Sequence, residues 1–250
     1  LPICCGFSNT ARRGRDILFW LLNMLISLAI VATITTVVMA SLIRLWPYRL
    51  DLTLKHYNID LAGGYTPLWT SVGISALAAI VGTLLLFLLT FGIRRQPGRT
   101  ADFATLLSAL PVGVPGLVLG LAYVFTFNSA DLPWGMLYGT ALLVALCNYY
   151  HYHTQGFTTM MMGMRHVPGS MEDATNVLGG GVVRIMRDVY LPAMRVTIIS
   201  VAMFLFMRSM VTLSAVIFLV TPSLPLGAVT VMRLDEAGFT SQAAAFSTCI

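Results

Sequence analysis

The sequence predicts an all-α membrane protein, a polytopic bundle of about six transmembrane helices with a helix-turn-helix on its cytoplasmic side. Of the 250 residues, 57% are hydrophobic and 10% are charged, whereas about a quarter of the residues in a soluble domain are charged. Several uncharged runs also exceed the roughly 20 apolar residues that a helix needs to cross a bilayer core of about 30 Å. The arginines, finally, gather beside alternate ends of these runs, as they do in multi-spanning proteins.

The uncharged runs give the expected spans in order. Four are long enough outright: residues 17–43, 67–93, 103–127, and a run from 132 that becomes polar near 149–153. A fifth run, 196–220, is interrupted only by Arg208. A sixth begins near Gly238 and reaches Ile250 after about 13 residues, too few to span. Because the chain also starts at Leu1 rather than Met, we expect a fragment that lacks both ends, with its last helix truncated.

These runs divide the chain into four expected parts. They are a cytoplasmic tail (1–16), a first peripheral transmembrane helix (17–45), a periplasmic segment (46–66) and a core domain (67–250). The first span stands apart because a polar segment with tryptophan and tyrosine residues suited to the headgroup level follows it. A signal peptide is the less favoured interpretation, since its apolar region has about 7 to 15 residues.

The arginines set the expected orientation. Those before the first span, those at 94–99 and those at 165–195 fall on one side, which the positive-inside rule makes cytoplasmic. The N-terminus is therefore predicted to be cytoplasmic in a multi-pass protein. The net charge of +5 follows from the same rule, so no nucleic-acid partner is expected.

The stretch "LPVGVPGLVLGLAY" in the third run combines helix breakers with small residues. Pro111 and Pro115 are expected to kink the helix, and Gly116 and Gly120 have the GxxxG spacing of closely packed membrane helices. Two interpretations stay open, ordinary helix packing and a broken helix that lines a translocation pathway. On the second interpretation, Pro111, Pro115 and Gly116 are pathway residues.

Arg208 is the one charge inside a predicted span. A guanidinium costs at least a few kcal/mol when it faces lipid, so Arg208 is expected to face the bundle or an aqueous cavity. It could steer an anion along a pathway, pair with a backbone carbonyl, or extend toward the headgroups. These alternatives remain open at the level of sequence.

His151 and His153 do not form a convincing metal site. Residues at i and i+2 lie on different faces of a helix, and the neighbouring tyrosines indicate an interfacial belt at the inner end of the fourth span. No metal-binding residues are therefore predicted.

The cytoplasmic stretch before the fifth span predicts a helix-turn-helix, which we call the elbow (residues 168–192). Ser170 is a candidate N-cap, and Glu172 and Asp173 follow in the first turn, where the helix dipole favours anions. The glycines at 179–181 permit a turn with positive φ. A second amphipathic piece then ends before Pro192. Such an exposed element requires a partner, either the lipid surface or another protein.

The elbow resembles the EAA signature of ABC importer permeases, which reads Glu-Ala-Ala, three residues, Gly, nine residues, Ile-x-Leu-Pro. The spacing is kept throughout, with Asp in place of Glu, Thr in place of the second Ala and Val in place of Ile. Glu172 could supply the acidic role one position earlier. The residues that carry the resemblance are Asp173, Ala174, Thr175, Gly179, Val189, Leu191 and Pro192.

Four further stretches, 52–57, 110–128, 207–222 and 231–238, look like permeases for 2-aminoethylphosphonate and, less closely, ferric iron permeases. The resemblance implies a permease subunit in a bacterial inner membrane, in contact with lipid, with its elbow docked on an ATP-hydrolysing subunit. It also implies a second permease subunit or half, two ATPase subunits and a periplasmic solute-binding protein as partners.

The chain is not expected to be an enzyme. The pattern GxxxxGK[ST] is absent and the single lysine, Lys55, lies outside the elbow, so the triple glycine is not a nucleotide-binding loop. ATP and Mg²⁺ would be bound by the partner subunit, and no cofactor is expected on this chain.

The predicted function is import of 2-aminoethylphosphonate. A ferric iron importer is the main alternative, followed by a secondary transporter, which would usually show inverted repeats or intramembrane acids, and a membrane scaffold.

Overall fold

A computed structural model describes residues 9–45, 48–58, 63–96, 98–129 and 133–250. It confirms an all-α membrane helix bundle. The helices of eight or more residues are α1 (Asn9–Leu42), α2 (Thr66–Arg95), α3 (Arg99–Ala109), α4 (Gly116–Phe127), α5 (Ala141–Arg165), α6 (Gly169–Val177), α9 (Arg195–Val211), α10 (Gly227–Glu236) and α11 (Thr240–Cys249). Shorter pieces are η1 (Lys55–Tyr57), η3 (Leu110–Gly113), η4 (Pro133–Leu137), α7 (Val182–Ile185), the π-helical turn η5 (Met186–Tyr190) and α8 (Leu191–Ala193).

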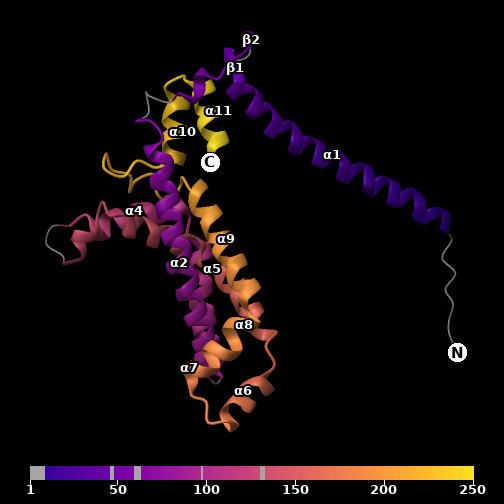
Figure 1. Cartoon of the computed structure of the whole chain (residues 1–250), viewed down its shortest axis with the longest axis vertical. Coiled ribbons are helices and arrows are strands. Elements are labelled where there is room, and N and C mark those ends of the chain that lie inside the picture. The colour runs from indigo at the N-terminus through magenta and orange to yellow at the C-terminus, as the bar shows by residue number, and fades with distance from the viewer. Residues whose placement is uncertain (1–8, 46–47, 59–62, 97, 130–132) are drawn as a thin grey trace.

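The centre of the molecule is a bundle of α2, α5 and α9 (Figure 1). Its helices approach closely because glycine occurs where they cross. A methyl group built on Gly82 of α2 would lie 2.7 Å from Cδ2 of Tyr149 and 2.9 Å from Cδ1 of Leu205. One built on Gly156 of α5 would lie 2.6 Å from Cδ1 of Leu86. Small residues therefore allow the helices to pack closely, which matters because no hydrophobic effect drives helix association in lipid.

The first helix differs from the expected span in its bounds and its surroundings. Helix α1 begins at Asn9, inside the predicted cytoplasmic tail, and ends at Leu42 rather than residue 45. It extends away from the bundle in Figure 1 and contacts α11. Its large apolar side chains between Ile17 and Ile34 are more than half exposed. In the structure this helix lies outside the bundle of α2, α5 and α9.

A small β-hairpin, not anticipated from the sequence, lies within the predicted periplasmic segment and at its edge. Strand β1 (Ile43–Leu45) pairs antiparallel with β2 (Arg49–Leu52). The hydroxyl of Tyr57 lies 3.0 Å from Ser41 Oγ and 3.1 Å from Thr248 Oγ1, so hydrogen bonds join this segment to α1 and α11. The hairpin and the elbow lie at opposite ends of the bundle (Figure 1).

The predicted third span is broken. Helices α3 and α4 meet at 102° across η3 and the residues that follow it. Pro111 lies in the first turn of η3 and Pro115 is the N-cap of α4, so the prolines interrupt the helix as predicted. Gly116 and Gly120 are buried where α4 meets the segment after α9, because added methyl groups would collide with Ser214 and with the carbonyl of Ala215. The glycines show the close packing and the prolines show the broken helix, whereas a role of this segment in lining a translocation pathway stays a prediction.

The predicted fourth span was misplaced. The sequence indicated a helix from 132 to about 153, but α5 runs from Ala141 to Arg165, about 37 Å at 1.5 Å per residue. Two of its polar side chains face protein: Asn148 Nδ2 donates to Ser209 Oγ at 2.6 Å, and Thr154 Oγ1 donates to the Ser108 carbonyl at 3.0 Å. His153 lies mid-helix, 2.9 Å from the Tyr149 hydroxyl, so the interfacial belt predicted there is wrong.

The predicted fifth span is also shorter and bent. Helix α9 ends at Val211, and α7 to α8 meet it at 76°. By length and composition, two described helices can cross a membrane, or four if each bent pair forms one span. The expected final helix is present as α11, after α10 and a turn at Gly238.

The glycine contacts predict a difference between two sites on α2. Gly82→Val should lower the melting temperature in detergent, since overpacking costs about 1–3 kcal/mol. Gly73 is exposed and has no atom within 4 Å of an added methyl group, so Gly73→Val should change stability by less than about 0.5 kcal/mol. Thermal unfolding of both variants provides the measurement. Equal losses would contradict close packing at Gly82.

Candidate functional site

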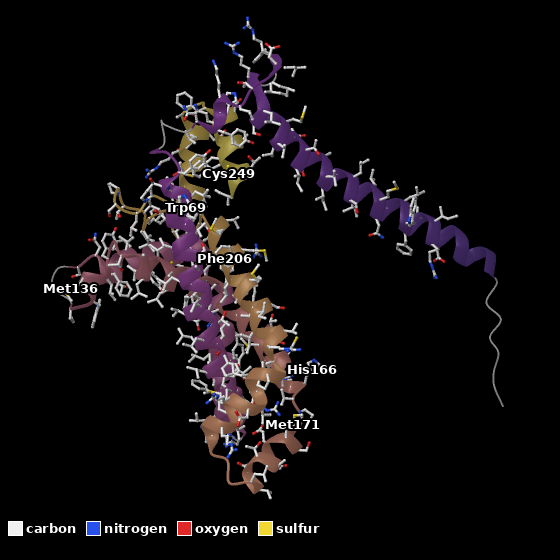
Figure 2. All side chains as sticks on the ribbon, viewed as in Figure 1. Trp69, Met136, His166, Met171, Phe206 and Cys249 are labelled. Carbon is white, nitrogen blue, oxygen red and sulfur yellow. The ribbon has the colours of Figure 1, made fainter. Side chains whose placement is uncertain are left out.

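The elbow folds at one end of the bundle, where Figure 2 labels Met171 on its first helix and His166 before that helix. Helix α6 begins at Gly169 with Pro168 as its N-cap, and no side chain caps it. The predicted N-cap, Ser170, instead lies in the first turn. Pro168 has φ of −64° and ψ of 138°, an extended conformation outside the helical region. Its ring fixes φ near this value, which suits a residue just before a helix.

The turn after α6 is a Schellman motif. Gly179 has φ of 72°, Gly180 N donates to the Thr175 carbonyl at 2.9 Å, and Gly179 N donates to the Asn176 carbonyl at 3.0 Å. These bonds satisfy carbonyls that the helix end leaves free. Gly180 is buried in the turn, and a methyl group on it would lie 2.6 Å from Cγ2 of Thr175. The predicted glycine turn is therefore present, with positive φ at Gly179.

The second half of the elbow is anchored by its apolar side. Ile185 and Tyr190 are fully buried and Met194 is 2% exposed, all in the core cluster formed with α2, α5 and α9. Val189 packs on the same cluster. Leu191 is 42% exposed, and Pro192 is the second residue of α8, close to the 76° bend before α9. The π-helical turn between α7 and α8 lies within this anchor, and such turns are frequent at functional sites.

The tip of the elbow is apolar and uncovered. Val177 and Leu178 are 87% and 80% exposed, and Val183 is 71% exposed. They project from the two sides of the glycine turn, beside the exposed residues Asp173 and Ala174. A contiguous exposed apolar patch of this kind is typical of a protein or membrane contact.

Arg94, which the sequence indicated only as a cytoplasmic charge, joins α2 to the elbow. Its Nη2 donates to the Val167 carbonyl at 2.7 Å, its Nη1 to the Met164 carbonyl, and its Nε to Glu172 Oε1 at 3.3 Å. The Tyr190 hydroxyl donates to the same Oε1. The guanidinium carbon also lies 5.4 Å from the centre of the Tyr190 ring. No sequence signal indicates this network, because its members are up to 96 positions apart.

Two of the predicted pathway residues, Arg208 and Gly116, lie against adjacent residues of α5. Arg208 is exposed, with its guanidinium carbon 5.4 Å from the Tyr152 ring centre and 5.9 Å from that of Phe204. A methyl group on Gly116 would lie 3.1 Å from Cε1 of His151. Pro111 is buried and Pro115 is exposed on the same broken segment. Sequence reasoning missed Tyr152 as the stacking partner of Arg208 because it ended the helix near that residue.

Arg208 is not a member of an ion pair within the part of the chain that the structure describes. There the ion pairs are Arg15–Asp16, Arg94–Glu172 and Arg184–Asp188. Among the same residues, His, Cys, Asp and Glu side chains form no group of three that could hold a metal ion.

The chain is similar to two curated proteins and to solved structures. The putative ferric transport system permease protein FbpB 1 of Haemophilus influenzae is 29% identical over 70% of this chain and 28% of its own length. The ferric transport system permease protein FbpB of Actinobacillus pleuropneumoniae is 25% identical over 82% of this chain and 30% of its own length. The chain thus spans under a third of these relatives. No protein-family model matches it.

One of these solved structures is a bacterial ABC transporter involved in the import of the acidic polysaccharide alginate. Its matched chain superposes with a TM-score of 0.71 over 94% of this chain and 91% of its own length, at 15% identity. The bundle therefore has the fold of an ABC transporter membrane subunit. Fold and relatives together confirm the resemblance to ABC importer permeases, and the named relatives are of the ferric type.

The glycine turn predicts unequal effects of two alanines. Gly179→Ala forces a side chain into the left-handed region, at a cost of about 1–2 kcal/mol, and should speed tryptic cleavage at the exposed Arg184 several-fold. Gly181 has φ of −80° and open space around it, so Gly181→Ala should be cleaved at the wild-type rate. Similar cleavage rates in both variants would show that the turn does not depend on Gly179.

Proposed function

We propose that the chain is a membrane-spanning permease unit of an ATP-driven, binding-protein-dependent importer, and that ferric iron is its cargo. The exposed apolar tip of the elbow, carried on a turn of fixed geometry at one end of the bundle, is the observation on which this rests. A tip of this shape suits a cleft in an ATP-hydrolysing subunit. The residues assigned to coupling are Glu172, Asp173, Ala174, Thr175, Gly179, Val189, Leu191 and Pro192.

The mechanism follows from how the elbow is attached. Closure of the ATPase subunits would move the tip, and the buried Ile185 and Tyr190 would carry that movement to α2, α5 and α9. Because α8 meets α9 at a bend rather than through a loop, displacement of the elbow would tilt α9. ATP and Mg²⁺ would bind to the partner, and a second permease unit and a periplasmic binding protein would complete the importer.

The relatives favour iron over 2-aminoethylphosphonate as cargo. Both curated relatives carry ferric transport in their names, and neither supports the phosphonate expectation drawn from shorter stretches. Arg208 bears on the same choice. A guanidinium attracts an anionic phosphonate and repels a bare ferric ion, so with iron as cargo Arg208 is better explained as the residue that stacks α9 on Tyr152 of α5.

The docking role predicts loss of the ATPase. Leu178→Asp places a charge on the apolar tip, and the amount of ATPase subunit that copurifies from the host should fall at least about tenfold. Met136→Asp is the matched control, since Met136 is 86% exposed on η4, far from the elbow (Figure 2). Copurification that survives Leu178→Asp would contradict docking at the tip. A wild-type protein without any ATPase would favour a secondary transporter.

Cargo is tested by uptake of labelled ferric iron and of labelled 2-aminoethylphosphonate in the host, using the complete gene and its deletion. We expect the deletion to reduce ferric iron uptake and to leave phosphonate uptake unchanged. The opposite result would restore the phosphonate interpretation.

Arg208→Gln supplies the control in the same assay. With iron as cargo, uptake should remain within about twofold of wild type, because the stacking contact is weak at an exposed site. With phosphonate as cargo, removal of the charge should reduce the affinity of uptake.

A further inference from the structure

Arg94 contacts four parts of the chain that meet at the base of the elbow. Its three guanidinium nitrogens donate to α5 at Met164, to the connection at Val167 and to α6 at Glu172, and its face lies over Tyr190 of η5. The carbonyls of Met164 and Val167 lie at and just beyond the C-terminal end of α5, where a cation is favoured. The Met164 carbonyl also accepts from the Val167 N at 3.2 Å, so Arg94 adds a further donor at this helix end.

Helix α6 has little else to hold it. It has nine residues, none of them buried, and no side chain caps its N-terminus. An isolated helix of this length is marginal in water. Glu172 is the side chain through which α6 makes its charged contact with the bundle, and the position of α6 therefore depends on it.

The contact is stronger than an ordinary surface ion pair. The side chains of Arg94 and Glu172 are 22% and 19% exposed, and the carboxylate oxygen that faces Arg94 also accepts the hydroxyl of the fully buried Tyr190. Charge-assisted hydrogen bonds that are shielded from water are about twice as strong as neutral ones. By comparison, the Arg184–Asp188 pair on the same elbow is 65% and 53% exposed, and such pairs contribute little.

We propose that Arg94 is a positioning residue that, with Glu172 and Tyr190, locks α6 to α2, so that movement of the elbow tip reaches α2 as well as α9. The carboxylate of Glu172 is then bound within the chain, by Arg94 and Tyr190. Asp173, which is exposed at the next position, is the acid left to contact the ATPase. This inference rests on the proposed function for its role in coupling, while the lock itself is a property of this chain.

The lock is tested by amide hydrogen exchange of residues 169–178 in the purified full-length protein. Arg94→Gln, Glu172→Gln and Tyr190→Phe each remove one member with little change in shape. We expect exchange about tenfold faster than wild type in the first two variants, and a smaller increase in Tyr190→Phe, which keeps the ring. The double variant Arg94→Gln/Glu172→Gln should exchange no faster than the quicker single variant, because both remove the same interaction.

Asp188→Asn is the matched control, since it removes a carboxylate from an exposed pair on the same elbow. Its exchange over 169–178 should equal that of wild type. Unchanged exchange in Glu172→Gln and Tyr190→Phe would overturn the lock. If Arg94→Gln fails to fold, these two variants still decide the question.

Coupling gives the second readout. In the assembled importer, the ratio of ATP hydrolysed to ferric iron taken up should rise several-fold in Glu172→Gln, while ATPase copurification stays at the wild-type level. If ATPase copurification is lost while this ratio rises, Glu172 has a merely structural role, and the proposal is contradicted. Absence of the ATPase from the wild-type protein would refute the proposed function, but faster exchange in the variants would still support the lock.

Discussion

The close approach of α2, α5 and α9 is the contact on which the rest of the structure depends. Gly82 and Gly156 let side chains of the neighbouring helices fill the space that a methyl group would occupy. Because lipid is as apolar as the side chains, such packing and hydrogen bonds between helices replace the hydrophobic drive of soluble proteins. The same packing gives the buried Asn148 of α5 a protein partner, since its Nδ2 donates to Ser209 Oγ.

The elbow is built on the same bundle and combines a fixed base with an unpartnered tip. Its base has two kinds of attachment, the buried side chains Ile185 and Tyr190 and the polar network around Arg94. The tip has neither, and its exposed valine and leucine side chains are what a second protein would cover. The proposed coupling role requires a rigid base, since an elbow that deforms at its base cannot pass movement of its tip to the membrane helices.

The fourth span was misplaced because hydropathy does not show which side of a helix faces protein. The run from residue 132 looked like a span and the polar stretch after 153 looked like a loop, yet α5 occupies 141–165. Hydropathy averages over all sides of a helix, whereas the cost of a polar side chain depends on the side it faces. The same reason hid Tyr152 as the partner of Arg208. For cargo, short shared stretches resemble phosphonate permeases, whereas the longer matches are to proteins named for ferric transport.

The sequence by itself determined the class of protein, the peripheral first helix, the break at Pro111 and Pro115, and the glycine turn of the elbow. These features follow from composition, from backbone restrictions of single residues and from spacing over about 20 positions. Tertiary structure alone decided which acid of the elbow is held and by what. Arg94, Glu172 and Tyr190 meet because three helices converge at one end of the bundle, and no local pattern encodes a contact between residues so far apart in the chain.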